Sequence, residues 1–366
     1  MKRSNNSNLK ILSLAVFALS IFWIIPGCKK IYGVLPDDKD FMSEQVDFTT
    51  KTFTPVIGRT NLLNGNFVAD GSTLPLTFEM LNVRRNDGAA APELTDSLPT
   101  LVWTAAYTGQ EKSISEIEAK RKLEKHPVFE VRKSGELIFW NTSTNTLVPY
   151  FQGSNSAPGG TSYYYLFDIK VSNSGGSKLI KDLVLNPFRE RAYDPYEFDP
   201  VSNVLLPNPN ASIVPTTLVG MKGIDTRKQL SNNNATNNSD VKVTIVRTGD
   251  GNSLTFKFLD RNNNSINPDL FNQTKWATLV HGFNMQKTNE FVRYDIAYPI
   301  PLIVRPTPYT TADGSKALVE FSYTRLGFNG IRENGKMTLN FNIFRQGDWE
   351  INFKFTTESP RFEDEF

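Results

Sequence analysis

The side chains that could bind a metal or act as a nucleophile are few and widely separated in this sequence. Its 366 residues contain two histidines, His126 and His281, and one cysteine, Cys28. Neither histidine stands at ligand spacing from a second metal-binding residue, so a zinc or iron site is not expected. The chain also contains no G-x-S-x-G segment, the turn that presents a nucleophilic serine in many hydrolases. We therefore expect no cofactor and no metal.

Two groups of oxygen-bearing side chains offer alternatives. Asp260–Ser265 copies the oxygen spacing of a calcium loop, but its sixth position is not glycine and its twelfth is Phe271. We expect a turn between strands there, because Asn and Asp tolerate left-handed geometry. Asp194, Glu197 and Asp199 could supply the acids of a glycosidase, which can lie anywhere in a sequence. We interpret them as solvated loop charges, and a glycoside hydrolase stays an alternative.

The cysteine ends an N-terminal segment that has the features of an export signal. Three basic residues precede an apolar run over residues 11–25, and the small residue Gly27 stands directly before Cys28. The run is too short for a transmembrane helix and lacks a second flank. A thiol at this place resembles the lipobox of bacterial lipoproteins. We predict that residues 1–27 are a signal peptide and that Cys28 is lipidated, the alternative being an unlipidated signal-peptide cysteine.

Composition excludes some classes of partner and of stabilisation. Without the three basic residues of the signal, 37 basic side chains face 38 acidic ones. This balance gives no basic footprint for a nucleic acid, so we expect no nucleic-acid partner. A lone cysteine cannot form an internal disulfide, so the fold must depend on burial of the 26 Phe, 12 Tyr and 5 Trp side chains.

The first half of the chain reads as a β-sandwich of the immunoglobulin-like kind. Residues 28–50 read as a tether, and from residue 51 short alternating runs are punctuated by turn signals. Residues 128–140 predict a hairpin with a glycine-bearing turn, and residues 163–171 predict a long strand. We place this domain at residues 51–185.

One helix is predicted inside that domain. Ser113 and Glu116 have the spacing of a capping box, and the helix formers that follow run to Lys125, before His126 and Pro127. The basic run Lys120–Lys122 would then lie beside glutamates at helical spacing, which is typical of a solvated face.

The second half predicts a second β-sandwich domain at residues 241–366. Residues 186–240 are rich in proline and end in an Asn-rich run, so we interpret them as a partly ordered connection ending in an exposed loop. Asn267 could cap a short helix running to about Val280. The sequence thus predicts a mainly β fold with two β-sandwich domains and one or two short helices. The strands of the second domain are expected at residues 241–246, 254–259, 317–323, 337–343 and 349–355.

Aromatic side chains give the remaining signal of function. Sugar rings present apolar C–H faces that stack on exposed aromatic rings, whereas aromatic residues in strands usually pack in the core. Tyr163 and Tyr165 share one strand face, and Trp349 is expected in the core. The ligand-binding candidates are Trp103, Trp140, Tyr163, Tyr165 and Trp276, and a wider set adds Tyr107, Tyr150 and Tyr164.

Several segments of the chain resemble an uncharacterised family of Bacteroidota lipoproteins. The segments that carry this resemblance are Tyr32–Phe41, Phe53–Thr60, Thr248–Leu254, Leu279–Asn284 and Gly347–Glu350. The resemblance carries over no functional residues. It implies an outer-membrane lipoprotein beside a TonB-dependent transporter in an uptake system of the starch-utilisation type. The cell surface is favoured over the periplasmic face, although lysines rather than acids follow the cysteine directly.

Three functional hypotheses follow from these observations. The first is a non-catalytic, lipid-anchored envelope protein that binds glycan or another nutrient polymer for uptake. The second is a structural or assembly lipoprotein that contacts a neighbouring membrane protein and binds no ligand. The third is the hydrolase, for which converging carboxylates in a deep cleft would be the distinguishing feature.

Overall fold

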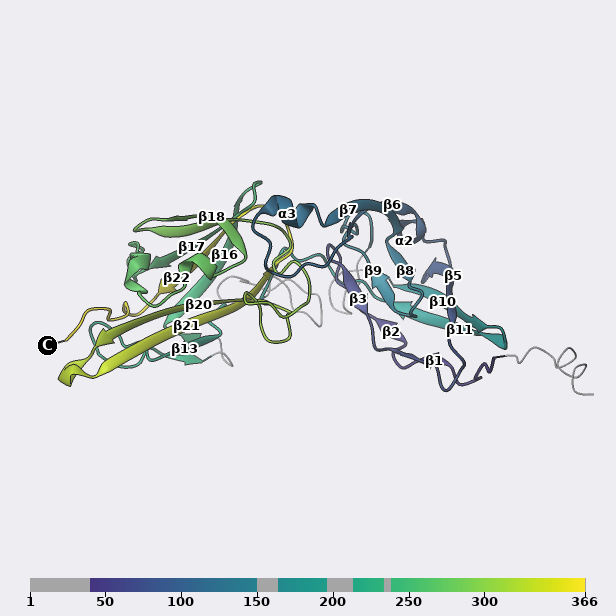
Figure 1. Cartoon of the computed structure of the whole chain (residues 1–366), viewed down its shortest axis with the longest axis horizontal. Coiled ribbons are helices and arrows are strands. Elements are labelled where there is room, and N and C mark those ends of the chain that lie inside the picture. Colours follow the sequence, from purple (N-terminus) through teal and green to yellow (C-terminus); the bar gives the residue numbers. More distant parts are fainter. Residues whose placement is uncertain (1–39, 150–163, 196–212, 234–237, 366) are drawn as a thin grey trace, which may run out of the picture.

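The chain forms two β-rich lobes that lie side by side along its long axis (Figure 1). We call residues 40–189 the first lobe and residues 190–365 the second lobe. Among the described residues, no helix is long and apolar enough to span a membrane. Cys28 and the predicted signal peptide lie outside them. The computed structural model describes residues 40–149, 164–195, 213–233 and 238–365.

The first lobe is built from several small sheets. Its largest sheet is four-stranded, in the order β2 (Thr52–Phe53), β11 (Gly176–Leu185), β10 (Tyr165–Asn173) and β5 (Thr77–Arg85). A three-stranded sheet follows the order β3 (Asn61–Leu63), β9 (Leu137–Phe139) and β8 (Phe129–Val131). The remaining elements are the pair β1 (Asp47–Phe48) and β4 (Phe67–Val68), and the one-turn helix α2 (Pro92–Thr95).

The core of the first lobe lies between these sheets. Phe167 of β10 packs against Phe53 and Phe129, with ring centroids 6.1 and 4.9 Å apart. The predicted hairpin of residues 128–140 is confirmed, and Gly135 supplies the positive φ of +86° that its turn requires. The predicted tether is too long, because Phe48 is buried in this core.

An arm connects the first lobe with the second. Strands β6 (Ser97–Trp103) and β7 (Arg121–Pro127) form an antiparallel ribbon, and the loop between them carries the helix α3 (Ile114–Glu118) over to the second lobe (Figure 1). We call residues 97–127 the arm. Val102, on the inner face of the ribbon, packs on Trp140 of the first lobe.

The arm corrects the helix prediction. The capping box is confirmed, since the Ser113 hydroxyl accepts the N–H of Glu116 at 3.1 Å. The helix nevertheless ends at Glu118, and Arg121–Pro127 is a strand. Helix propensity differs by only tenths of a kcal/mol among such residues, so a full ladder of bonds to β6 outweighs it.

The second lobe is a sandwich of two sheets. The five-stranded sheet has the order β16 (Val241–Gly249), β22 (Asp348–Phe355), β17 (Ser253–Leu259), β19 (Phe291–Ile296) and β18 (Gly282–Lys287). In the opposing sheet, β21 (Arg332–Ile343) pairs with β20 (Ala317–Leu326), β13 (Thr217–Val219) and β12 (Tyr193–Asp194). Shorter elements are the pair β14 (Asn232–Asn233) and β15 (Asn238–Ser239), and the turns η3 (Pro268–Leu270), η4 (Trp276–Thr278) and η5 (Phe328–Gly330).

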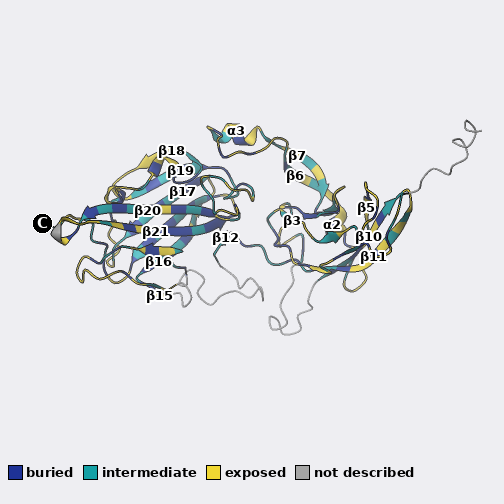
Figure 2. Cartoon of the chain, turned by 60° about the horizontal axis from the view of Figure 1, so that its bottom comes forward, coloured by how far each residue is buried: buried dark blue, intermediate teal, exposed yellow. Residues whose placement is uncertain are grey.

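Phenylalanine rings from both sheets fill the space between them. Phe321 of β20 contacts Phe256, Phe258 and Phe353 of the facing sheet, with ring centroids 5.6, 4.9 and 5.0 Å apart. Along β20, buried residues alternate with residues that are mostly only partly exposed, as expected for a strand with one face in the core (Figure 2). Trp349 is 2% exposed, which confirms its predicted place in the core. The fold is therefore mainly β, and its second lobe is a β-sandwich.

Two further predictions about the second half need revision. The region 186–240 is more than a connection, because β12 and β13 pair with β21 and so belong to the second lobe. Asn267 does act as a cap, accepting the N–H of Asp269 at 2.9 Å, but two separate 3₁₀ turns, η3 and η4, follow in place of one helix.

The predicted turn at residues 260–265 is confirmed. The Asp260 carboxylate accepts the backbone N–H groups of Asn262 and Asn264, both at 2.8 Å, and Asn263 has a φ of +68°. In the described part of the chain, no three His, Cys, Asp or Glu side chains are placed to hold a metal ion.

Candidate functional site at the lobe junction

Three of the five predicted ligand-binding aromatic residues fill the interior. Tyr165 is 1% exposed, and Trp140 and Trp276 are each 8% exposed. Tyr165 donates its hydroxyl to Glu93 at 3.0 Å, and the Trp140 indole N–H donates to Glu130 at 2.8 Å. The rings are packed rather than presented to solvent, which corrects the expectation of an exposed platform at these positions.

The two other candidates differ from these. Tyr163 lies outside the described residues. Trp103 is half-buried at the end of β6, where the ribbon ends and the loop of the arm begins. Its ring lies 5.7 Å from that of Tyr107. Of the five candidates, the structure therefore brings Trp103 to the junction of the two lobes.

A buried carboxylate organises the loop of the arm. Glu111, whose side chain is 2% exposed, accepts the backbone N–H groups of Thr108 and Gly109, both at 2.9 Å, and pairs with Lys120. Burial alone would raise the pKa of this carboxyl, but the Lys120 ammonium and the N–H donors outweigh burial and lower it to about 2. The ionised Glu111 thus fixes the loop that carries Tyr107.

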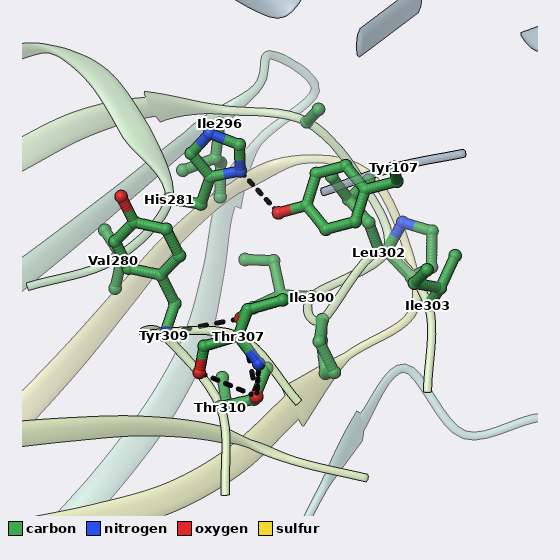
Figure 3. Close-up of a pocket in the computed structure, with 14 residues that line it drawn as sticks. Tyr107, Val280, His281, Ile296, Ile300, Leu302, Ile303, Thr307, Tyr309 and Thr310 are labelled. Carbon is green, nitrogen blue, oxygen red and sulfur yellow. Dashed lines mark hydrogen bonds between the residues drawn. The ribbon is translucent and has the colours of Figure 1, made fainter. Parts of the chain in front are cut away.

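His281 receives the arm on the side of the second lobe. Its Nε2 donates to the carbonyl of Glu111 at 2.9 Å. In the neutral ring Nδ1 is then the acceptor, and it accepts the Tyr107 hydroxyl (Figure 3). Tyr309 stacks flat on the imidazole, with centroids 5.0 Å apart and planes 2° apart. Burial raises the pKa of Tyr107 far above its ordinary value, so its hydroxyl stays protonated and able to donate.

A pocket opens beside this histidine. Its interior holds about 30 Å³, room for about two water molecules, and it measures about 460 Å³ only when the solvent at its open mouth is included. Tyr107, His281 and Tyr309 line it with aromatic surface and polar groups, while Thr307 and Thr310 contribute hydroxyls (Figure 3). Apolar side chains of the segment 296–303 form the remaining wall.

Two arginines hold the arm to this surface. Arg121 donates to the carbonyl of Tyr298 at 2.8 Å and lies 5.2 Å from the Trp103 ring. Arg305 donates to the carbonyl of Tyr107 at 3.1 Å. The side chain of Arg121 is 6% exposed and pairs with Glu118. The ion pairing predicted for the basic run is therefore present, but Arg121 lies at the junction rather than on a solvated face.

The predicted acidic group is only partly described. Asp194 is not a solvated charge: its side chain is 20% exposed and accepts a hydrogen bond from Arg59 of the first lobe at 3.2 Å. Glu197 and Asp199 lie outside the described residues. The carboxylate of Asp194 is therefore already hydrogen-bonded to a guanidinium rather than presented to a substrate.

Sequence reasoning overlooked most of this site. His281 was considered as a metal ligand alone, and Tyr309 was not considered. Tyr107 stood in the wider aromatic set, but nothing pointed to its partner, which is 174 residues away. No local signal in the sequence marks this pair, because its two members meet only in the folded chain.

Comparison with known proteins identifies the family of the chain. The chain is similar to the insect immune protein hemolin, at 12% identity over 82% of this chain and 52% of that one, with a TM-score of 0.16. It thus spans about half the length of that structure, and a superposition this poor carries no argument about fold or function. No curated protein matches it. Residues 67–364 match the family described as Domain of unknown function (DUF5007), and the chain therefore belongs to that family.

Proposed function

We propose that this chain is a non-catalytic, lipid-anchored envelope protein that binds glycan at the lobe junction. The segment before Cys28 supports export and lipidation, and the resemblance to Bacteroidota lipoproteins supports a place beside an outer-membrane uptake system. The observation that carries the binding role is the pair of half-buried rings of His281 and Tyr309, which line one pocket with threonine hydroxyls.

The chemistry of this set suits a sugar. The C–H face of a pyranose packs on an aromatic ring, and its hydroxyls need both donors and acceptors. Tyr309 is already held flat by His281, so little side-chain entropy is lost when a ligand stacks there. Thr307 and Thr310 lie beside it and supply hydroxyl groups. Because the interior of the pocket is small, the ligand would lie across its mouth, as the end or one residue of a longer chain.

Binding is tested with the full chain, purified in detergent, on a glycan array and by retention on polysaccharide affinity gels. Tyr309→Ala removes a stacking ring, and we expect its affinity for the retained glycan to fall about three- to tenfold. Phe328→Ala is the matched control, because Phe328 is 63% exposed on the η5 turn of the second lobe. The proposal fails if no glycan is retained, or if Tyr309→Ala binds as the native chain does.

Lipidation is tested separately in cells. Cys28→Ala should abolish incorporation of labelled fatty acid and release the protein from the membrane fraction. Protease added to intact cells then distinguishes a surface protein from one that faces the periplasm. Continued labelling of Cys28→Ala would show that the anchor lies elsewhere.

An assembly role without ligand is the second candidate. The observation in its favour is an apolar tip on the hairpin of β20 and β21, where Phe328 and Ile331 are 63% and 65% exposed. Co-purification with a transporter from detergent extracts, lost in a Phe328→Ser and Ile331→Ser double variant, would favour this role. Co-purification that survives the double variant would count against it.

A further inference from the structure

A second contact between the lobes holds a half-buried arginine. Arg59 lies in the loop that follows β2 and reaches the second lobe. Its Nη1 donates to Asp194 at 3.2 Å, and its guanidinium carbon lies 3.5 Å from the centre of the Phe344 ring. The aromatic face and the carboxylate together fix the plane of the guanidinium.

One edge of this guanidinium is unused. Nε and Nη2 of Arg59 are both buried, and neither has a hydrogen-bond acceptor in the structure over its described range. These two N–H groups point in parallel from the same edge. That edge is the one with which arginine binds two oxygens of a carboxylate, sulfate or phosphate.

A second guanidinium lies near the same carboxylate. Arg191 lies 3.6 Å from Asp194, measured from Nε to Oδ1, which is too long for a hydrogen bond. Its Nε is buried and, within the described residues, also lacks an acceptor. Oδ1 of Asp194 is likewise buried and, among the described residues, without a donor. Two guanidinium groups thus share one carboxylate, and these three side chains together carry one excess positive charge.

The physical cost of this arrangement indicates a missing anion. Burial, and repulsion from Arg191, lower the pKa of Arg59 to about 10 even though Asp194 acts in the opposite direction. Buried N–H groups without acceptors, and buried charge without a counter-charge, both destabilise a folded protein. An anion would both accept these hydrogen bonds and balance the charge of the described group formed by Arg59, Arg191 and Asp194.

We propose that the Nε–Nη2 edge of Arg59, with Arg191 beside it, is a binding site for an oxyanion between the two lobes. The chemical class is a carboxylate, sulfate or phosphate group, held by a fork of two N–H donors over Phe344. This site is separate from the pocket beside His281 and does not depend on the glycan-binding proposal. Its ligand bridges residues of both lobes, so binding should also stabilise their junction.

The test is titration of the full chain in detergent, followed by calorimetry, with sodium chloride adjusted to keep the ionic strength constant. Sodium sulfate and sodium phosphate probe a free anion. Trigalacturonate, with neutral galactotriose as its control, probes an acidic group on a sugar. Saturable binding of any of the three anions, with a matching rise in the midpoint of thermal unfolding, is the expected result.

Two variants make the test specific. Arg59→Lys keeps the charge but cannot present two parallel donors, so the affinity should fall at least tenfold. Asp194→Asn removes the carboxylate that competes for the two arginines, so the affinity should rise several-fold. Arg261→Lys is the matched control, because Arg261 is exposed and pairs with Asp225 across 3.6 Å. Its affinity should equal that of the native chain.

The outcomes separate the two sources of the anion. Binding of sulfate or phosphate alone assigns a free ion, and binding of trigalacturonate without galactotriose assigns an acidic sugar. If Arg59→Lys does not fold, the rise in anion affinity expected for Asp194→Asn still tests whether the site binds an anion. The proposal is overturned if no anion binds saturably, or if Arg59→Lys or Asp194→Asn leaves the affinity unchanged.

Discussion

The core of the second lobe and the junction between the lobes are stabilised by different physical means. In the core, rings such as Phe321 and Phe353 pack against one another with full burial. At the junction, a small apolar cluster around Tyr107 is supplemented by the carboxylate of Glu111 and the imidazole of His281. Burial of apolar area is insensitive to pH, whereas these polar contacts require particular protonation states.

The lobe cores and the junction therefore have different roles. Each lobe has its own apolar core, so each has a source of stability that does not depend on the other. The arm, held by Arg121 and Arg305, and the contact of Arg59 with Asp194 then set how the lobes meet. A site built at such a contact can respond to ligands and pH without unfolding either lobe. Four substitutions test that comparison, beginning with the one expected to have the largest effect.

Phe321→Ala should have the largest effect. The ring of Phe321 is fully buried against rings of both sheets, so its removal should lower the free energy of unfolding of the second lobe by about 3 to 5 kcal/mol. Phe167→Ala is the matched change in the first lobe. Denaturant unfolding followed by tryptophan fluorescence and by circular dichroism measures both. A single transition that shifts equally in the two variants would contradict independent lobes.

The core strands could be predicted from the sequence because the pattern that indicates them is local. Val241–Val246 and Trp349–Phe355 alternate apolar and polar residues, and such alternation fixes both the strand and the face that it buries. The turn at Asp260 was likewise predictable, since the side chains that close it lie within four residues. Local physics was sufficient for these elements.

The junction could not be predicted, because the residues that form it are far apart in the sequence. Tyr107 and His281, and Arg59 and Asp194, are partners only after both lobes have folded. Their residue types alone are compatible with a loop, a core or a metal site. The strand over Arg121–Pro127 also depends on its partner β6, so helix-forming composition was misleading there. Separation in sequence, rather than unusual chemistry, made the site unpredictable.

Glu111→Gln should have the second largest effect and should act on the junction alone. The substitution removes the charge that orders the loop of the arm, so we expect a loss of about 1 to 3 kcal/mol in the free energy that holds the arm in place. Hydrogen exchange of the amides in residues 104–120 measures local opening. Glu79→Gln is the control, because the side chain of Glu79 is 62% exposed and its carboxylate comes no closer than 4.0 Å to the Lys170 ammonium.

The same carboxylate predicts a dependence on pH. Its pKa in the folded chain, about 2, lies below the ordinary value of 4.5. The stability that it contributes is therefore fully present above about pH 4.5 and is lost as the pH falls toward 2. The protection factors of the amides in the arm, which correct for the pH dependence of intrinsic exchange, should fall across that window in the native chain, and much less in Glu111→Gln. An equal fall in both would assign the effect to another group.

Tyr107→Phe should have a smaller effect. It removes one hydroxyl and leaves Nδ1 of His281 without its donor, at an expected cost of about 1 kcal/mol in arm docking. Tyr309→Phe keeps the ring that stacks on His281 and should leave docking nearly unchanged. The readout is again hydrogen exchange in residues 104–120. An effect of Tyr107→Phe as large as that of Glu111→Gln would mean that the histidine, rather than the carboxylate, dominates the junction.

Leu123→Thr should have the smallest effect, and it tests the outer face of the arm. Leu123 is 69% exposed and lies opposite Leu101 in the β6–β7 ribbon. Threonine favours strands, so the pairing should persist, and the free energy of unfolding should change by less than about 0.5 kcal/mol. The measurement is thermal unfolding of the full chain. A loss above about 1 kcal/mol would show that this face is covered in solution, and the arm would then be part of a core rather than a bridge between two.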